Sequence, residues 1–185
     1  MQIQTLIIPE IKIITPTKIG DGRGFFSETY HKKRLAELGI EAEFVQDNHA
    51  FSARANTVRG LHFQIPPYAQ AKLIRVIQGA VLDVAVDIRH GSPYYGRYVS
   101  AVISESRWNQ IFIPAGFAHG LVTLEENTAV LYKVSNYYSP EHDMGLLWND
   151  PDLGIDWPVT SDEAILSDKD RQQPRFKDLP GYFVY

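Results

Sequence analysis

Short apolar, β-branched runs alternate along this chain with turn residues, a pattern that is typical of strands. From residue 44 onward the runs recur at short spacing, and Gly, Pro or Asn ends most of them. The predicted strands are Thr5–Ile8, Ile11–Thr15, Phe25–Tyr30, Phe44–Asn48, Thr57–Gln64, Lys72–Gln78, Val81–Ile88, Tyr98–Ser104, Gln110–Ile113, Gly120–Leu124 and Thr128–Tyr138. Many short strands at regular spacing indicate a mainly β sandwich or barrel rather than a parallel α/β sheet.

Helical signals are few and short. His31–Leu38 is the best helix candidate because Gly39 stands where a C-terminal cap would lie. From Pro140 the chain is rich in proline and loses its periodicity, so we expect ordered loops there, with short helical turns near Ser161–Asp170. We therefore expect one domain over residues 1–185, with N-terminal strands and a short peripheral helix (about 1–45), a barrel core (46–139) and a wrapping C-terminal segment (140–185).

The run Val81–Ile88 shows the strand alternation most clearly. One face carries Leu82, Val84, Val86 and Ile88, which we expect to pack against the core. The other face carries Val81, Asp83, Ala85 and Asp87. Because two carboxylates make that face too polar for a core, we expect it to line either a cavity or solvent.

Composition removes several classes of function. With 44% hydrophobic and 22% charged residues, the chain is typical of a globular protein. The absence of cysteine excludes disulfides, thiolate metal sites and cysteine nucleophiles. A net charge of -4 without a basic run argues against nucleic-acid binding. No run approaches the ~18 apolar residues of a membrane span, and the first residues do not resemble a secretion signal, so we expect a cytoplasmic protein without membrane contact.

The predicted strand Thr57–Gln64 holds the first residues with candidate chemistry. His62 can act as a general base near neutral pH if a partner fixes its tautomer, although an isolated histidine in an apolar strand is more often a packed core residue. Strict alternation places Arg59 and His62 on opposite faces of the strand. The two side chains can share one pocket only if Gly60 interrupts the pleat.

A Pro-x-Gly turn at residues 114–116 delivers a second histidine, His119, to the following strand. The phrase is similar to that of cupin barrels, in which a histidine after such a turn often binds metal. A metal site needs three or four converging ligands. Phe63 and Gln64 follow His62 where a second histidine and a glutamate would be needed, so the sequence disfavours a metal site.

Two further segments carry polar groups that a pocket can use. Tyr132 and Tyr138 share a face of the predicted strand, and a tyrosine in a pocket can donate a proton or stack on a base, although most interior tyrosines simply pack. Charges of both signs alternate over residues 167–171, which is usual for a solvated face or a helix start. A carboxylate from this segment can also fold back onto a histidine and orient it.

Taken together and in order, seven blocks resemble the dTDP-4-dehydrorhamnose 3,5-epimerase family. They span about residues 20 to 170, nearly the whole chain, which makes the resemblance specific. The blocks are GDGRGFF (20–26), FVQDNH (44–49), RGLHFQ (59–64), DVAVDIR (83–89), IPAGFAHG (113–120), YKVSNYY (132–138) and LSDKD (166–170).

The resemblance implies a cupin-like jelly-roll barrel that forms a homodimer and uses neither metal nor cofactor. It implies inversion of carbons 3 and 5 of dTDP-4-dehydro-6-deoxy-D-glucose, which gives dTDP-4-dehydro-6-deoxy-L-mannose on the route to dTDP-L-rhamnose. A hydrogen beside a ketone is acidic because the resulting anion spreads onto the carbonyl oxygen. Such an epimerisation needs a base, a stabiliser at the oxygen and a proton donor on the other face.

By this resemblance, His62 is the base and Asp170 is the carboxylate that pairs with it. Lys72 is the cation beside the forming enolate, and Tyr132 is the acid that reprotonates from the opposite face. None of these steps needs a covalent nucleophile, which agrees with the absence of cysteine.

The resemblance also implies a nucleotide-binding set. Arg23 and Arg59 match positions near the diphosphate, where a guanidinium suits phosphate oxygens, and Tyr138 matches a tyrosine that stacks on thymine. Asp143 stands where the family typically has Glu, and Asp83 is ranked below the other candidates. The remaining positions that match the ligand site are Glu28, Gln46, Asp47, Asn48, His119 and Lys169.

Three alternatives stay open at this level. A single-centre epimerase or a ketoisomerase on the same scaffold shares most binding residues, although the complete set of His62, Lys72, Tyr132 and Asp170 favours double inversion. A non-catalytic cupin-like binding module would keep the arginines and lose the proton-transfer set. A metal-dependent cupin oxygenase is disfavoured because the ligands for a metal are missing.

Overall fold

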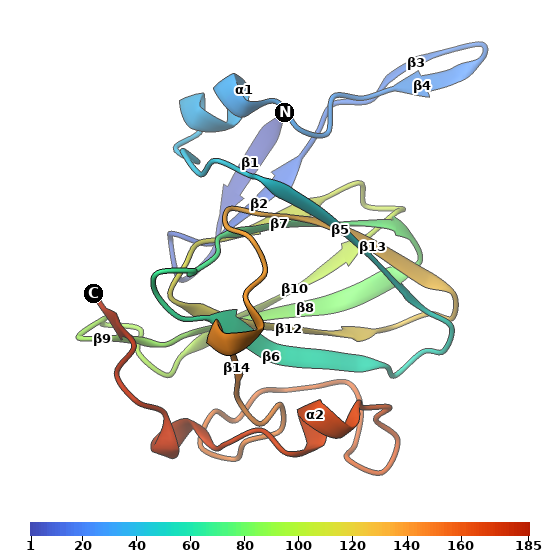
Figure 1. Ribbon diagram of the computed structural model, residues 1–185. Coiled ribbons are helices and arrows are strands. Elements are labelled where there is room, and N and C mark those ends of the chain that lie inside the picture. The colour runs from blue at the N-terminus through green and yellow to red at the C-terminus, as the bar shows by residue number, and fades with distance from the viewer.

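Two antiparallel sheets face each other in the computed structural model, which describes residues 1–185 (Figure 1). The larger sheet has the order β1-β2-β11-β7-β13-β5 and consists of β1 (Gln2–Thr5), β2 (Lys12–Thr15), β5 (Gln46–Ser52), β7 (Lys72–Gln78), β11 (Gln110–Ile113) and β13 (Thr128–Val134). The second sheet has the order β10-β8-β12-β6-β14 and consists of β6 (Val58–Gln64), β8 (Ala80–Asp87), β10 (Tyr98–Ser104), β12 (Phe117–Thr123) and β14 (Asp143–Gly145). The mainly β, cupin-like fold expected from the sequence is confirmed.

Apolar side chains fill most of the space between the two sheets. Ile74 and Val130 of the larger sheet meet Ala85 and Leu121 of the second sheet in one cluster of buried residues. Complete burial of a side chain of this size stabilises the fold by about 1.5–3 kcal/mol. This cluster packs the two sheets against each other beside the cavity that polar side chains line.

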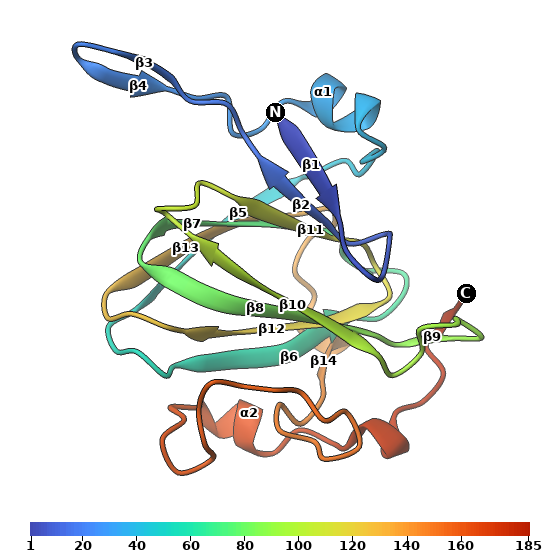
Figure 2. The same cartoon turned by 180° about the vertical axis from the view of Figure 1, so that it is seen from behind.

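The outer face of the second sheet is buried as well. After β14, residues 146–182 run beneath it as loops and short helical turns (Figures 1 and 2). Leu146 and Leu153 of this segment pack in one cluster against Leu61, Val84 and Val86. The C-terminal segment is therefore the layer that covers the second sheet.

Because both faces of β8 are covered, the interpretation of its polar face needs a correction. Val81 and Ala85 belong to the core between the sheets and touch neither cavity nor solvent. Asp87 is fully buried and bonded to Arg89, and Asp83 is fully buried and bonded to His119. The carboxylates are tolerated inside because each has a partner, which alternation alone does not reveal.

Several strand bounds differ from the predicted ones because pairing partners, rather than apolar runs, set strand length. β5 begins at Gln46 and continues to Ser52, since all seven of its residues pair with β13. β12 begins at Phe117, three residues before the predicted start, because it pairs with β8 along its whole length. β13 ends at Val134, so Tyr138 lies beyond the strand.

The helices are short and capped by side chains. α1 (Lys32–Glu37) begins after His31, whose ring accepts a hydrogen bond from Arg34 N–H, and α2 (Asp168–Arg171) begins after Ser167. The predicted helical turns near residues 161–170 thus reduce to α2. The 3-10 turns are η1 (Pro140–His142) and η2 (Phe176–Asp178). None of the helices has the length and apolar composition that a bilayer crossing requires.

The N-terminal segment contributes strands to the edge of the larger sheet and a hairpin that extends away from the barrel. β1 lies at the edge of the larger sheet, earlier than the predicted strand Thr5–Ile8, and all four of its residues are exposed. The hairpin of β3 (Ile19–Asp21) and β4 (Gly24–Phe26) projects into solvent and is shorter than the predicted strand Phe25–Tyr30 (Figure 1). At the other end of the chain, β15 (Phe183–Val184) pairs in parallel with β9 (Arg89–His90).

Candidate active site

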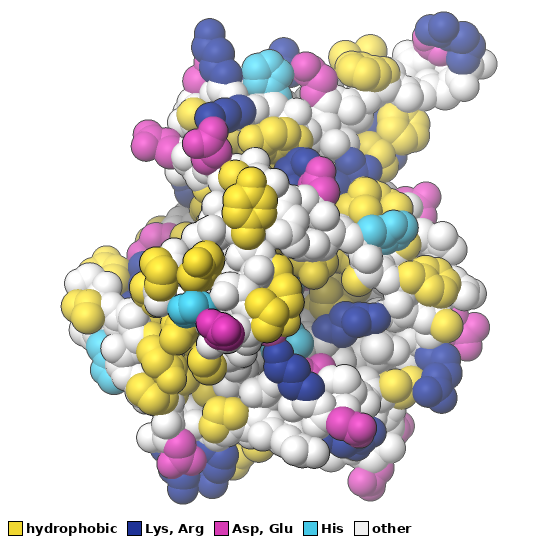
Figure 3. All heavy atoms as spheres, in the orientation of Figure 1, with side chains coloured by type: hydrophobic (Ala, Val, Ile, Leu, Met, Phe, Trp, Pro, Cys, Tyr) yellow, Lys and Arg dark blue, Asp and Glu magenta, His cyan; other side chains and the backbone are white.

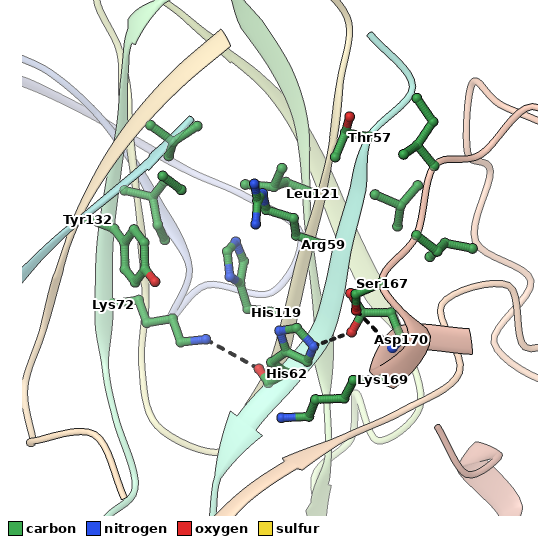
Figure 4. A pocket seen from close by; sticks show the side chains of 16 residues that line it. Thr57, Arg59, His62, Lys72, His119, Leu121, Tyr132, Ser167, Lys169 and Asp170 are labelled. Atoms are coloured by element: carbon green, nitrogen blue, oxygen red, sulfur yellow. Dashed lines mark hydrogen bonds and ion pairs between the residues drawn. The ribbon is translucent and has the colours of Figure 1, made fainter. Parts of the chain in front are cut away.

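A cavity of about 510 Å³ opens between the two sheets. In the space-filling view, basic side chains gather around a hollow in the middle of the face shown (Figure 3). Strands of both sheets and the segment that leads into α2 contribute the walls (Figure 4). The lining residues are Ala50, Thr57, Val58, Arg59, His62, Lys72, Ile74, His119, Leu121, Val130, Tyr132, Ile165, Leu166, Ser167, Lys169 and Asp170.

A bulge in β6 brings two of these side chains to the same wall. His62 pairs with His119 and Arg59 pairs with Leu121, so two residues of β6 stand opposite the single residue Gly120. Gly60 within the bulge has a φ of +119°, a value that side chains disfavour, and a Cβ there would lie 2.6 Å from Gly120 Cα. Gly60 thus interrupts the pleat, and both Arg59 and His62 line the cavity.

His62 is bound to a carboxylate from the far end of the chain. Its Nε2 lies 2.5 Å from Asp170 Oδ1, and the Asp170 side chain is only 5% exposed (Figure 4). Burial raises the pKa of Asp170, but the hydrogen bonds from His62 and Ser167 outweigh it and hold that pKa below its ordinary value. The ionised carboxylate fixes the imidazole and can stabilise its protonated form.

Lys72 extends from β7 toward His62. Its Nζ lies 3.3 Å from the carbonyl oxygen of His62 (Figure 4). Burial lowers the pKa of Lys72 to about 8, against the attraction of Asp143 and Asp83. A cation that is poorly hydrated and near its pKa is suited to stabilise a developing negative charge.

Tyr132 lies across the cavity from His62, on β13 (Figure 4). Burial raises the pKa of its phenol, with a smaller opposing effect from Arg59. The phenol therefore keeps its proton at neutral pH. A protonated phenol on one side and an imidazole on the other can deliver and remove protons at opposite faces of a ligand.

His119 forms a second pair with a carboxylate. Its Nε2 lies 2.9 Å from Asp83 Oδ2, and the Asp83 side chain is completely buried. Burial lowers the pKa of His119, although Asp83 attracts the charged form. Asp83 was ranked low from the sequence, and the available signal was a carboxylate inside an apolar strand.

Other predicted binding residues border an adjacent hollow of about 330 Å³, which shares His62, Lys72 and Tyr132 with the cavity. Its further lining includes four of the predicted residues: Gln46, Asn48, Tyr138 and Asp143. Asp143 Oδ2 accepts a hydrogen bond from Lys169 Nζ at 2.5 Å and one from Tyr138 OH at 3.3 Å. The cavity and the hollow thus adjoin at three shared side chains and together offer space for a ligand with several parts.

Three predicted residues lie outside the cavity of their own chain. Arg23 is at the tip of the β3–β4 hairpin and pairs with Asp21. Glu28 pairs with Arg34 near α1. Asp47 pairs with Lys133 and lines a separate hollow of about 310 Å³.

Two residues without a sequence prediction support the site. Ser167 Oγ accepts a hydrogen bond from Asp170 N–H at 3.1 Å and so caps α2; a serine three residues before an acidic residue was the available signal. Ser52 Oγ accepts one from Arg59 Nε at 3.3 Å, for which the sequence carries no signal. No group of three or more His, Asp or Glu side chains is arranged to hold a metal ion.

Comparison with known proteins decides the family. Residues 5–178 match the family model of dTDP-4-dehydrorhamnose 3,5-epimerase. The chain belongs to this family. A dTDP-4-dehydrorhamnose 3,5-epimerase of Sinorhizobium fredii is 50% identical over 185 residues, which are 100% of this chain and 94% of the relative. The resemblance predicted from the ordered blocks is confirmed.

Solved structures of epimerases superpose closely on this member of the family. A dTDP-6-deoxy-D-glucose-3,5-epimerase from Legionella pneumophila, in complex with dTDP-4-keto-L-rhamnose, is 41% identical with a TM-score of 0.94, covering 100% of this chain and 98% of that chain. A 3'-monoepimerase from Streptomyces bikiniensis, in complex with dTDP-quinovose, is 31% identical with a TM-score of 0.85, covering 94% and 87%. The scaffold is therefore shared by enzymes that differ in the number of centres they invert.

Proposed function

We propose that this chain is a dTDP-4-dehydrorhamnose 3,5-epimerase that converts dTDP-4-dehydro-6-deoxy-D-glucose to dTDP-4-dehydro-6-deoxy-L-mannose. The observation that carries the proposal is the arrangement around one cavity of a histidine–carboxylate pair, a lysine and a facing tyrosine, in a chain of this family. The proposal places the reaction in the cytoplasm, without metal or cofactor, as expected from the sequence.

In the first step His62 takes the proton from the carbon beside the ketone. Nδ1 is the nitrogen that acts, because Nε2 is bound to Asp170. The electron pair of the C–H bond moves into the ring, and the carbonyl oxygen becomes an enolate. Asp170 holds the ring and balances the charge of the imidazolium.

Lys72 stabilises the enolate oxygen in this scheme. Its pKa of about 8 leaves the ammonium charged at neutral pH, and the surrounding protein withdraws it from water. Its charge therefore acts through a low dielectric, where electrostatic stabilisation is strong.

Tyr132 completes the inversion by donating its phenolic proton to the carbon from the opposite face. Solvent then restores the phenol and removes the proton from His62. The same cycle at carbon 3 and at carbon 5 inverts both centres, and each cycle exchanges one carbon-bound hydrogen with solvent.

The adjoining cavity and hollow supply places for the other parts of the substrate. Tyr138 borders the hollow and is the proposed platform for thymine. Lys169 and Arg59 provide cations along the cavity wall for the diphosphate, and Gln46, Asn48, Asp143 and His119 provide polar contacts.

We also propose a homodimer in which the β3–β4 hairpin reaches the partner. Ile19, Phe25 and Phe26 of this hairpin are 65%, 54% and 64% exposed, which is costly for apolar side chains in a monomer. Arg23 at the tip and the nearby Glu28 lie outside the cavity of their own chain. Packing of the hairpin on a second copy would cover the apolar side chains and bring Arg23 and Glu28 to the partner's site.

Solvent exchange tests the proposed reaction directly. The 4-keto sugar nucleotide is incubated with the protein in heavy water, and deuterium at carbons 3 and 5 is read by NMR. Label at both carbons with formation of the L-sugar is the expected result. Label at one carbon would identify a single-centre epimerase such as the Streptomyces relative, and label at neither would refute the proton-transfer mechanism.

A further inference from the structure

Asp83 is a buried carboxylate that the mechanism above does not use. We propose that Asp83 is a positioning residue for the epimerisation: it holds the ring of His119 so that Nδ1 is available to a hydroxyl of the substrate sugar, and its buried charge stabilises the cation of Lys72, which lines the same cavity as His119. This inference rests on the proposed function and deepens it.

Asp83 lies in the interior of the fold. β8 is an inner strand, flanked by β10 and β12, and the Asp83 side chain has no solvent exposure. Oδ2 accepts from His119 Nε2 at 2.9 Å. Oδ1 is also buried and makes no hydrogen bond with any protein group. A buried charge with half of its bonding capacity unused destabilises a fold unless nearby positive charge compensates it.

The positive charge that compensates Asp83 is that of Lys72, which lines the active-site cavity. Val81 and Ala85, two residues to either side on the same face of β8, are ordinary core residues, so packing there does not require a carboxylate. The hydrogen bond of Asp83 goes to His119, and Asp83 also attracts the charge of Lys72. Both partners line the cavity.

Asp83 fixes which nitrogen of His119 is free. With Nε2–H donated to the carboxylate, a neutral ring presents the lone pair of Nδ1 and can accept a hydrogen bond from a hydroxyl. Burial and the neighbouring Lys72 and His62 lower the pKa of His119 against the pull of Asp83, which favours the neutral ring. This contact acts in both ground and transition states, so its loss raises KM more than it lowers kcat.

Asp83 acts on Lys72 through charge. Two carboxylates attract the ammonium, Asp83 from β8 and Asp143 from β14. The other titratable groups that line the cavity are His62, His119, Tyr132, Arg59, Lys169 and Asp170. Removal of the Asp83 charge leaves Asp143 as the remaining carboxylate that attracts Lys72, so the ammonium loses its proton at lower pH.

The test compares Asp83→Asn with Asp87→Asn. Asp87 is a matched control because it is also fully buried on the same face of β8 but bonds to Arg89 and Ser92, which do not line the cavity. For Asp83→Asn we expect the alkaline limb of the kcat profile to move to lower pH, so that kcat falls at least about threefold further at pH 8.5 than at pH 6.5. We expect Asp87→Asn to lower stability without moving that limb.

The His119 part of the inference has its own readouts. In a His119→Asn background, Asp83→Asn should no longer raise KM, while the shift of the alkaline limb should persist. Nitrogen-15 NMR of histidine in the wild-type protein needs no variant, and we expect a neutral His119 with its proton on Nε2 at pH 7. A proton on Nδ1 alone, or a charged ring, would overturn the positioning of His119.

The outcomes separate this inference from the proposed function. If the wild type labels both carbons in heavy water and Asp83→Asn matches Asp87→Asn in its pH profile, Asp83 is only structural and the inference is wrong. If the wild type labels neither carbon, the proposed function fails and the inference fails with it. A shifted limb for Asp83→Asn alone supports both.

Discussion

His62 and His119 are direct partners across the β6–β12 pair, and each is bound to its own aspartate. The environments of the two imidazoles nevertheless differ. The His62 side chain is 31% exposed, whereas that of His119 is 12% exposed. A base must exchange its proton with solvent between turnovers, and His62 is the more accessible of the two to solvent. This difference supports the proposal that His62 transfers protons and that His119 contacts the ligand.

Removal of the base should abolish proton exchange. For His62→Ala we expect no deuterium at either carbon, and for Asp170→Asn we expect kcat to fall by about 10²-fold or more, the usual contribution of a positioned acid–base group. NMR in heavy water measures both. Because the pKa of Asp170 lies below the ordinary aspartate value of 3.8, the carboxylate is ionised at every pH at which the enzyme is assayed. An Asp170→Asn enzyme with wild-type kcat at pH 7 would contradict the role of the pair.

Tyr132→Phe should separate the rate of hydrogen exchange with solvent from the rate of inversion. Without the phenol, His62 can still remove a proton and return one to the same face, so exchange continues while inversion slows. We expect the ratio of exchange to inversion to rise by about tenfold or more. Equal loss of the two rates would argue that Tyr132 only shapes the cavity.

The buried charge of Lys72 should lower the stability of the fold, although the enzyme needs this charge for activity. Its pKa falls from 10.5 to about 8 in the folded state, and one unit corresponds to ~1.4 kcal/mol. At pH 7, which is below the pKa of Lys72 in both the folded and the unfolded state, the destabilisation by the buried charge is fully present. This destabilisation disappears as the pH rises from about 8 to 10.5. We expect Lys72→Met to raise the free energy of unfolding by up to about 3 kcal/mol at pH 7, measured in urea, and to abolish turnover. A less stable variant would contradict this sign.

Activity of the wild type should fall on the alkaline side for the same reason. Loss of the Lys72 proton removes the cation at the enolate, so kcat should decline as pH rises through about 8. Initial rates between pH 6 and pH 9.5 measure this limb. A flat profile would show that the charge of Lys72 does not assist the rate-limiting step.

Gly60→Ala should damage both stability and the site. Its Cβ would lie 2.6 Å from both Gly120 Cα and His119 O, at a φ of +119°. Strain and overpacking of this kind cost about 2–5 kcal/mol together. Gly22→Ala is the matched control, because a Cβ at Gly22 meets nothing within 4 Å. Thermal unfolding compares the two variants, and an equal effect would show that the bulge does not depend on Gly60.

Variants of the hairpin test the proposed dimer. Phe26→Ser should move the protein toward the monomer in analytical ultracentrifugation, whereas Val184→Ser, a control that is 84% exposed at the opposite end of the chain, should not. If the hairpin serves the partner's site, Arg23→Ala and His62→Ala subunits should regain activity when they are mixed and refolded together. A monomeric wild type, or mixtures without recovery, would refute this arrangement.

The sequence predicted more of the site than of the strands that carry it. The resemblance to the family predicted His62, Lys72, Tyr132 and Asp170 as one site, and the four side chains do line one cavity. The bounds of β5 were missed because five of its seven residues are polar, so that its pairing with β13, and not an apolar run, defines the strand. The importance of Asp83 was underestimated because the alternation of residues along one strand does not show which part of a strand face borders a cavity and which part packs in the core. Arg23 and Glu28 lie apart from the cavity. Sequence blocks assign these residues to the ligand site but do not show whether they reach the site of their own chain.

The wrapping C-terminal segment has a consequence for biosynthesis. His62 and Asp170 are 108 positions apart, so the catalytic pair closes one of the longest loops in the chain. The barrel strands are all translated before Asp170, and a nascent chain that has formed both sheets still lacks the carboxylate. In the proposed mechanism, the His62–Asp170 pair therefore forms only when the segment that carries Asp170 leaves the ribosome and docks beneath the second sheet. A nascent chain that ends before Asp170 is expected to lack this pair and to turn over the sugar nucleotide more slowly.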